Sequence, residues 1–213
     1  MPAASVIIPV YNEMKDIESV LKKIRKDYEV IVVDDGSDMD ICGFLGKKAD
    51  KCIRLEKNTG KGYACRVGAE HASCEKIVFI DGDSQLDPYQ IPQFVSALDK
   101  ADMVVGFRSR SDVPFQRMIS NTFAAVMVFL STRRFYRDVL CGFRAFRKSK
   151  FLEMGLRSNR YEFETETMIK ASRRGLSVIQ VPVSVEYKRR GMGIKESVRV
   201  VIYQIKELIR SYV

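Results

Sequence analysis

Short runs of β-branched and apolar residues alternate with helical patterns through the first hundred residues, and this alternation strongly constrains the fold. The apolar runs are SVIIPV (5–10), VIVV (30–33), CIRL (52–55), KIVFI (76–80) and DMVVGF (102–107). Between them, apolar side chains recur at helical spacing, as at Ile17, Val20, Leu21 and Ile24. Strands separated by helices form a mainly parallel sheet, and runs without polar alternation indicate strands covered on both faces. The sequence therefore predicts a Rossmann-like α/β sheet flanked by helices, with ligands bound beyond the carboxyl ends of the strands.

The second half of the chain has a looser pattern. It predicts an apolar helix over 115–131, a strand at CGFRAF (141–146), an amphipathic helix over 163–174 and a proline-broken strand over 176–187. A basic amphipathic helix is expected over 194–212. Because no repeat or linker interrupts the 213 residues, we expect one domain spanning 1–213.

The cysteines, the single histidine, the N-terminus and the net charge limit the classes of protein to which this chain can belong. We expect the five cysteines, Cys42, Cys52, Cys65, Cys74 and Cys141, to be reduced cytosolic thiols, because the count is odd and no pair has a CxxC spacing. A single histidine leaves little for histidine-based chemistry. The N-terminus does not resemble a signal peptide, and the apolar stretch over 118–130 is too short to span a bilayer. The net charge of +9 is compatible with a solvated basic surface or with binding to phosphates, anionic lipids or nucleic acid.

Acidic residues stand at the ends of two predicted strands. VIVV is followed by Asp34 and Asp35, and KIVFI by Asp81, Gly82 and Asp83, while the first strand ends in PVYNE. Parallel strands bring these ends to one edge, where Asp81 and Asp83 can reach a Mg²⁺ or Mn²⁺ ion, Gln85 can add an amide oxygen, and Gly82 allows close backbone approach. Such acids can also merely cap helices or shape turns, but three converging strand ends favour a ligand site.

Several motifs, in order along the chain, resemble those of glycosyltransferase family 2. They are PVYNE, VVDDGSDMD, NTGKGYACRVGAE, IDGDSQLDP, CGFRAF and EFETET, and the resemblance runs from about Ser5 to about Lys195. It implies a GT-A fold and an inverting, metal-dependent transfer from a nucleotide sugar. The sequence looks most similar to the dolichyl-phosphate mannose synthases and related polyprenyl-phosphate transferases. On this interpretation residues 1–110 bind the nucleotide sugar and residues 111–213 bind the acceptor.

The resemblance also implies roles for particular residues. For the donor nucleotide it implies Pro9, Tyr11 and Glu13, an aspartate of the second motif that is Asp34 or Asp35, and Arg108. For the metal and diphosphate it implies Asp81, Asp83 and Gln85. For phosphate contacts it implies Arg189 and Lys195, which keep the family's spacing of six, while a family arginine in the apolar helix falls on Gln116, with Arg117 beside it.

The acceptor is the main open question. A phosphate acceptor is already nucleophilic and needs only cations, for which Arg117, Arg144, Arg189, Arg190 and Lys195 are candidates. A hydroxyl acceptor needs a general base, and Glu162, Glu164 and Glu166 form the one late acidic cluster. We expect these glutamates to be solvated, with Glu162 and Glu166 sharing a helix face and Glu164 pointing away. The donor can be GDP-mannose or a UDP-sugar.

A polyprenyl phosphate would place the enzyme at a membrane. The helix over 115–130 carries AAVMVFL and is followed by RRFYR, which suits a helix lying among lipid headgroups, although a buried core helix has the same composition. We expect a cytoplasmic protein bound peripherally to the cytoplasmic leaflet, directly or through a membrane-protein partner. A nucleic-acid-binding module would explain the basic charge, but no such motif is present and converging aspartates would repel a phosphate backbone. A sugar-1-phosphate nucleotidyltransferase would carry a Gly- and Arg-rich loop where this chain has PVYNEMKD.

Overall fold

The computed structural model describes residues 2–109, 115–186, 201–203 and 205–206, without the side chains of 115–117. Its described part contains a seven-stranded sheet in the order β3-β2-β1-β4-β6-β5-β7. The strands are β1 (Ser5–Val10), β2 (Glu29–Asp34), β3 (Lys51–Arg54), β4 (Lys76–Phe79), β5 (Met103–Arg108), β6 (Arg144–Arg147) and β7 (Val178–Val183). The helices are α1 (Met14–Lys23), α2 (Ile41–Leu45), α3 (Lys61–His71), α4 (Ile91–Ala97), α5 (Phe115–Thr132), α6 (Lys148–Glu153) and α7 (Glu162–Arg173), with short 3₁₀ turns η1 (Gly46–Lys48) and η2 (Pro88–Gln90).

The predicted mainly parallel sheet is confirmed. β1 pairs in parallel with β2 and β4, β2 with β3, and β5 with β7, while β6 runs antiparallel between β4 and β5. β6 and β7 come from the second half of the chain, so both halves contribute to one sheet. Pro182 lies inside β7 rather than breaking it, which is possible because β7 is the edge strand in this order.

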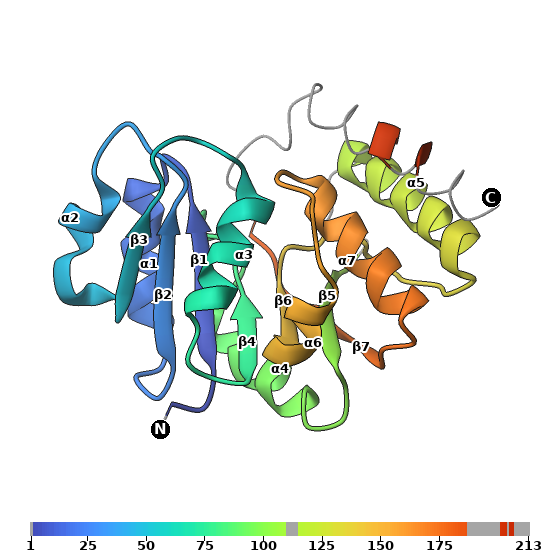
Figure 1. Ribbon diagram of the computed structural model, residues 1–213, viewed down its shortest axis with the longest axis horizontal. Helices are drawn as coiled ribbons and strands as arrows, with labels where there is room; N and C mark the ends of the chain where they lie inside the picture. Colours follow the sequence, from blue (N-terminus) through green and yellow to red (C-terminus); the bar gives the residue numbers. More distant parts are fainter. Residues whose placement is uncertain (1, 110–114, 187–200, 204, 207–213) are drawn as a thin grey trace.

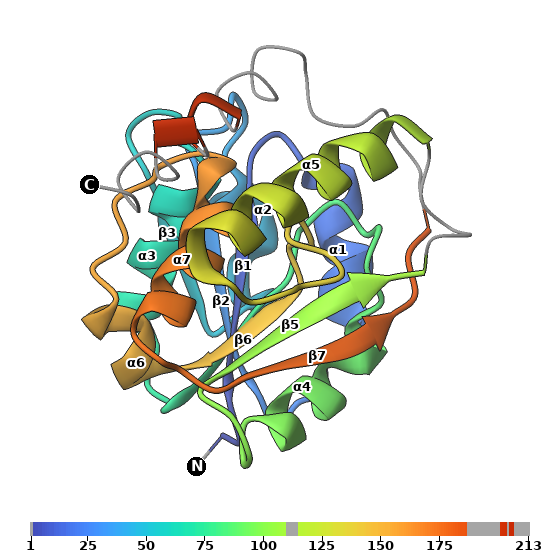
Figure 2. The same cartoon turned by 90° about the vertical axis from the view of Figure 1, so that its right-hand side faces the viewer.

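Helices cover both faces of the sheet (Figures 1 and 2). One face packs against α3, α5, α6 and α7, and the other against α1, α2 and α4, giving two buried apolar layers. Side chains alternate between them, so Ile7 faces the first layer and Val6 and Ile8 face the second. The sheet interior is buried on both sides, as runs without polar alternation predict.

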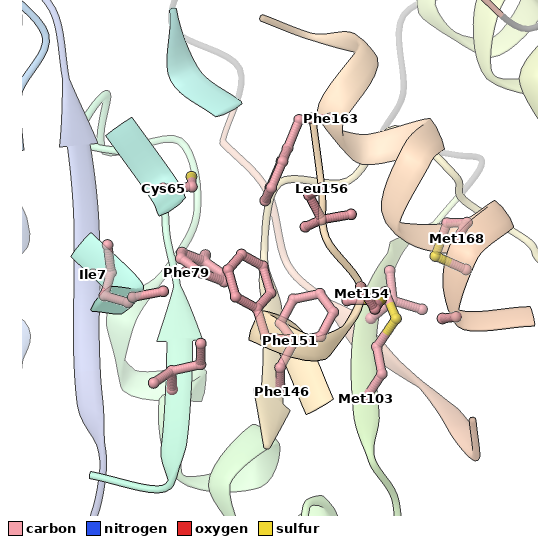
Figure 3. Packing of buried hydrophobic residues seen from close by; sticks show 14 of the residues in the cluster. Ile7, Cys65, Phe79, Met103, Phe146, Phe151, Met154, Leu156, Phe163 and Met168 are labelled. Carbon is pink, nitrogen blue, oxygen red and sulfur yellow. The ribbon is translucent and has the colours of Figure 1, made fainter. Parts of the chain in front are cut away.

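An aromatic cluster joins α6 and α7 to the middle of the sheet (Figure 3). Phe79 of β4 packs against Phe151 with ring centroids 5.1 Å apart and edge-on against Phe163 of α7 at 6.1 Å. Phe146 of β6 lies 5.7 Å from Phe79. Each buried phenylalanine contributes on the order of 1.5–3 kcal/mol. The cluster fixes the start of α7 beside the end of β4.

The expectation that every cysteine is a free thiol is wrong for Cys42 and Cys52, which form a disulfide. Cys42 lies on α2 and Cys52 on β3, and the chain between them turns back so that their Cα atoms are 5.5 Å apart. That separation falls in the range a disulfide requires. Cys65, Cys74 and Cys141 are free, and burial raises the pKa of the Cys141 thiol to about 12.

Candidate active site

The carboxyl ends of β1 and β2 are tied together by their loops. Asn12 donates its backbone N–H to Ser37 Oγ (2.9 Å), and its side-chain oxygen accepts from the N–H of Asp38 (3.0 Å). Asn12 adopts a left-handed backbone conformation with φ 57°, which is uncommon outside glycine. The first and second motifs therefore meet at one edge, as predicted.

Asp34 and Asp35 both lie at this edge, and both are buried. Asp34 Oδ1 accepts from the N–H of Ser37 (2.9 Å), and Arg54 Nε lies 3.6 Å from its other oxygen. Asp35 accepts from the N–H groups of Thr59 (2.8 Å) and Gly60 (2.7 Å). Burial raises the pKa of Asp35, although these two N–H donors oppose the shift. These bonds shape the loop before α3.

The end of β4 carries an ion-paired triad. Lys61, the first residue of α3, places its Nζ 2.6 Å from Asp81 Oδ1 and 2.8 Å from Glu164 Oε1. Burial alone would lower the pKa of Lys61, but the two carboxylates raise it well above its usual value. The second oxygen of Glu164 is buried without a hydrogen-bond partner. A largely enclosed cation, 17% exposed, thus faces the first aspartate of the predicted metal pair.

Glycine at position 142 lets Asp81 and Lys61 pack closely against the backbone. A Cβ atom there would lie 2.3 Å from Asp81 Oδ2 and 2.7 Å from Lys61 Nζ. Gly82 fits as tightly, since its Cβ would meet Val10 Cγ1 at 2.5 Å. A side chain at position 142 would displace Asp81 and Lys61, and one at position 82 would press against Val10 of β1.

Asp83 lies on the turn after Asp81. Gln85 donates both its backbone N–H (3.0 Å) and its side-chain amide (2.5 Å) to the Asp83 carboxylate. The amide nitrogen of Gln85, rather than its oxygen, therefore faces Asp83. Ser84 between them has φ 56°, and its hydroxyl donates to Asp16 of α1 (3.2 Å). The described residues contain no group of three His, Cys, Asp or Glu side chains placed to hold a metal ion. Two carboxylates and an amide within five residues still suit a hard cation whose remaining ligands come from a bound diphosphate.

Two of the late glutamates are not solvated as expected. Glu164 and Glu166 are both buried, because the helix that carries them packs its first turns against α3 and the preceding loop. Glu166 accepts from the N–H groups of Arg157 and Ser158 and pairs with Lys170 at 2.8 Å. These donors hold the pKa of Glu166 low despite burial. Glu166 stabilises the loop before α7, whereas Glu164 faces the triad.

Arg144, a candidate for binding an acceptor phosphate, is not available to a ligand. It is completely buried, and its guanidinium donates to the carbonyls of Val139 (2.5 Å), Cys141 (2.8 Å) and Glu164 (2.7 Å). Burial lowers its pKa. A guanidinium with these partners supports the loop before β6 and the start of α7, and it is closed to an acceptor phosphate.

The remaining predicted residues are placed in different ways. Pro9 is buried in β1, Tyr11 is 44% exposed beyond it, and Glu13 precedes α1. Arg108 forms a two-pronged pair with buried Asp138, at 2.6 and 2.9 Å. The side chain of Arg117, and the whole of Arg189, Arg190 and Lys195, lie outside the described residues.

Sequence reasoning missed Lys61 as a site residue. Lys61 stands in NTGKG, a motif that by itself indicates no role for its lysine. The signal available was the start of a helix at the carboxyl edge of the sheet, where a lysine has acids within reach. Glu164 was named in the late acidic cluster but was expected to be solvated and to point away, because spacing alone does not orient α7 against the sheet.

The helix α5 presents two different faces. Ala124, Ala125, Met127 and Val128 are buried. Ile119 (54% exposed), Phe123, Val126 (49% exposed) and Phe129 form an exposed apolar stripe. The sequence allowed either a core helix or an apolar surface helix here. One face of α5 is part of the core, and the other is an apolar surface. No helix among the described residues is long and apolar enough to cross a membrane.

The family model for glycosyl transferase family 2 matches residues 5–177, which include the triad and both aspartate motifs. The chain belongs to glycosyl transferase family 2. This confirms the resemblance found in the sequence, and the family assignment makes the protein a glycosyltransferase.

Relatives of this family 2 chain come from archaea and bacteria. An uncharacterized protein of Methanocaldococcus jannaschii is 38% identical over 200 residues, covering 85% of this chain and 87% of the relative. Glycosyltransferase AglJ of Haloferax volcanii is 28% identical over 85% of this chain and 62% of its own length. An undecaprenyl-phosphate 4-deoxy-4-formamido-L-arabinose transferase of Edwardsiella ictaluri is 29% identical over 88% of this chain and 61% of its own length. The chain thus spans about three-fifths of the length of these two named transferases.

A solved structure shares the fold. Glucosyl-3-phosphoglycerate synthase of Mycobacterium tuberculosis, solved with Mn²⁺, UDP and glucosyl-3-phosphoglycerate, superposes with a TM-score of 0.75 at 24% identity, covering 96% of this chain and 79% of the synthase. Another structure of that synthase contains Mg²⁺ and UDP. The predicted GT-A fold is confirmed by this likeness.

Proposed function

We propose that this glycosyltransferase is metal-dependent and inverting, and that it moves a sugar from GDP-mannose or a UDP-sugar to a polyprenyl or dolichyl phosphate. The donor half of this proposal rests on Asp81 and Asp83, which follow β4, and on Lys61 of α3, whose Nζ lies 2.6 Å from Asp81 Oδ1. The names of the undecaprenyl-phosphate transferases support the acceptor half. Residues 1–110 would form the donor half and 111–213 the acceptor half.

Asp81, Asp83 and Gln85 would hold the Mg²⁺ or Mn²⁺ ion, and the donor diphosphate would complete the ligands of the ion. When bound, the ion supplies charge neutralisation for the leaving diphosphate. Pro9, Tyr11, Glu13, Asp34 and Asp35 would line the nucleoside pocket, and Gly82 would let the backbone approach the ligand. Arg108, which is held by Asp138, would lie near the diphosphate.

The protein's own residues would set up the displacement. The acceptor phosphate oxygen forms a bond to the sugar carbon as the bond from that carbon to the diphosphate oxygen breaks, and the electron pair leaves on the nucleotide. Attack from the opposite face inverts the configuration. Lys61, fixed by Asp81 and Glu164, supplies positive charge close to the leaving group without reorganisation. Arg117, Arg189 and Lys195 would hold the acceptor phosphate.

A lipid acceptor requires contact with a membrane. The exposed stripe of α5 (Ile119, Phe123, Val126 and Phe129), with the exposed residues Arg133, Arg134 and Phe135 after it, suits a helix lying in the headgroup region of the cytoplasmic leaflet. The protein would then be peripheral, bound directly or through a membrane-protein partner. Flotation with anionic vesicles tests this step: Phe123→Glu with Val126→Glu should abolish association, and unchanged association would contradict it.

The transfer itself is tested with detergent-solubilised polyprenyl phosphate and labelled donors. We expect one donor to give a lipid-linked product of inverted configuration that requires Mg²⁺ or Mn²⁺ and is lost in Asp83→Asn. Transfer that continues in the presence of EDTA would contradict the proposal. So would the absence of transfer to polyprenyl phosphate with every donor tested.

A second candidate is transfer to a glycan hydroxyl. Glu164 favours it, because a carboxylate with one unpartnered oxygen beside Lys61 is a possible general base. Activity with a water-soluble acceptor that is lost in Glu164→Gln would support this alternative.

A further inference from the structure

A basic cavity lies on the far side of α7 from the triad. It has a volume of about 620 Å³ and is bounded by the loop before α7, one face of α7 and described residues near the C-terminus. Glu166 lines it, whereas Glu164 faces Lys61, and residues two apart are about 200° apart around a helix. The cavity is therefore distinct from the space beside Asp81.

Four cationic side chains converge on this cavity from three segments of the chain. Arg157 comes from the loop, Lys170 and Arg174 from α7 and its C-terminal cap, and Lys206 from the helical residues 205–206. Tyr203, on the same C-terminal segment, packs against the apolar layer that α7 covers. Basic residues at the end of α7 complement its dipole, but this does not account for Arg157 and Lys206.

Among the described residues that line the cavity, the single acid is Glu166, and it already has hydrogen-bond and ion-pair partners. Glu166 accepts from the backbone of Arg157 and Ser158 and pairs with Lys170 Nζ, which also donates to the carbonyl of Gly155 (2.5 Å). The side chains of Arg157, Arg174 and Lys206 contact no acidic partner among the described residues. Four cations against one carboxylate leave a net charge of +3 in a concave site, and an anionic ligand would relieve their mutual repulsion.

We propose that this cavity is an anion site for a phosphate-bearing ligand. A phosphate monoester carries about −1.5 to −2 charges at neutral pH and offers several acceptor oxygens, which match guanidinium donors in particular. The volume lies in the range of small-molecule sites, so a phosphorylated headgroup or a soluble phosphate compound fits. The site stands independently of the donor and acceptor assigned above.

The test uses the full chain in EDTA, so that no divalent ion supports phosphate binding at Asp81 and Asp83. Inorganic pyrophosphate is titrated by calorimetry, and phosphatidylcholine vesicles with and without phosphatidic acid are used in flotation. The variant is Arg157→Gln with Arg174→Gln, and the control is Lys23→Gln with Lys26→Gln, which removes the same charge near α1. Because both arginines are exposed, we expect the variant to keep its melting temperature.

We expect the cavity variant to bind at least one probe roughly tenfold more weakly, while the control binds as the wild type does. Weakened pyrophosphate binding would support a soluble ligand, and weakened binding to phosphatidic acid alone would support a lipid headgroup. Arg157→Lys with Arg174→Lys should restore part of the affinity. The proposal is overturned if neither probe binds the wild type, or if the cavity variant and the control behave alike.

Discussion

The ammonium group of Lys61 lies 2.6 Å from a carboxylate oxygen of Asp81 and joins it to Glu164, 83 residues away from Asp81 in the sequence. The start of α3, the end of β4 and the start of α7 therefore meet at one point. This point lies where parallel strands of an α/β sheet place their ligands.

Replacing Lys61 by methionine keeps the length of the side chain and removes its charge. We expect kcat to fall about 10²- to 10³-fold, because a fixed cation near the leaving group is lost. The measurement is steady-state transfer with saturating donor. Lys57→Met, a change in the loop just before α3, serves as the control and should leave kcat within a few-fold of wild type.

Replacing Gly142 by alanine should damage the site without unfolding the protein. The new Cβ would lie 2.3 Å from Asp81 Oδ2, so Asp81 and Lys61 must shift. A displacement of this kind can lower the rate on the order of 10²-fold. Activity and thermal unfolding are measured together. Full activity in the Gly142→Ala variant would show that the exact positions of Asp81 and Lys61 are not needed.

Glu166→Gln should lower stability and spare catalysis. The buried carboxylate satisfies two backbone N–H groups and Lys170, and a neutral amide cannot replace all three interactions. We expect the free energy of unfolding to fall by about 1–3 kcal/mol with kcat within a few-fold of wild type. Denaturant unfolding and transfer assays check this. A stable but inactive variant would indicate that Glu166 acts as the base.

Glu29 should make the fold sensitive to acid. Burial raises its pKa, but hydrogen bonds from Ser5 and Ser73 and the pair with Lys51 (2.9 Å) outweigh burial and lower it from 4.5 to about 2. A pKa lower in the folded state stabilises the fold above about pH 4.5, and this stabilisation is lost as the pH falls toward 2. Its full size is on the order of 3 kcal/mol.

Unfolding measured between pH 6 and pH 2 checks the role of Glu29. At pH 6 the Glu29→Gln variant should have a lower free energy of unfolding than the wild type. This difference in free energy should shrink as the pH falls toward 2. A difference that stays constant over this range would contradict the assignment.

The parallel strands, and the placing of Asp34, Asp35, Asp81 and Asp83 after the carboxyl ends of two of them, were predictable, because strand periodicity and topology rules act on local sequence. The antiparallel direction of β6 was not predictable, because a short apolar run does not indicate whether its strand lies parallel or antiparallel to its neighbours. The burial of Arg144 and Glu166 depends on how α7 packs against the aromatic cluster around Phe79. The disulfide between Cys42 and Cys52 depends on a chain reversal that cysteine spacing does not reveal.

Donor binding by calorimetry tests the central claim most directly, because it isolates Asp81 and Asp83 from the acceptor. GDP-mannose, UDP-glucose and UDP-N-acetylglucosamine are titrated with Mn²⁺ or Mg²⁺ into the wild type, Asp83→Asn and the distant control Asp99→Asn. We predict that one donor binds only with the ion, that Asp83→Asn abolishes this binding, and that Asp99→Asn preserves it. Equal binding to wild type and Asp83→Asn, or binding that does not need the ion, would contradict a metal-dependent donor site at the end of β4.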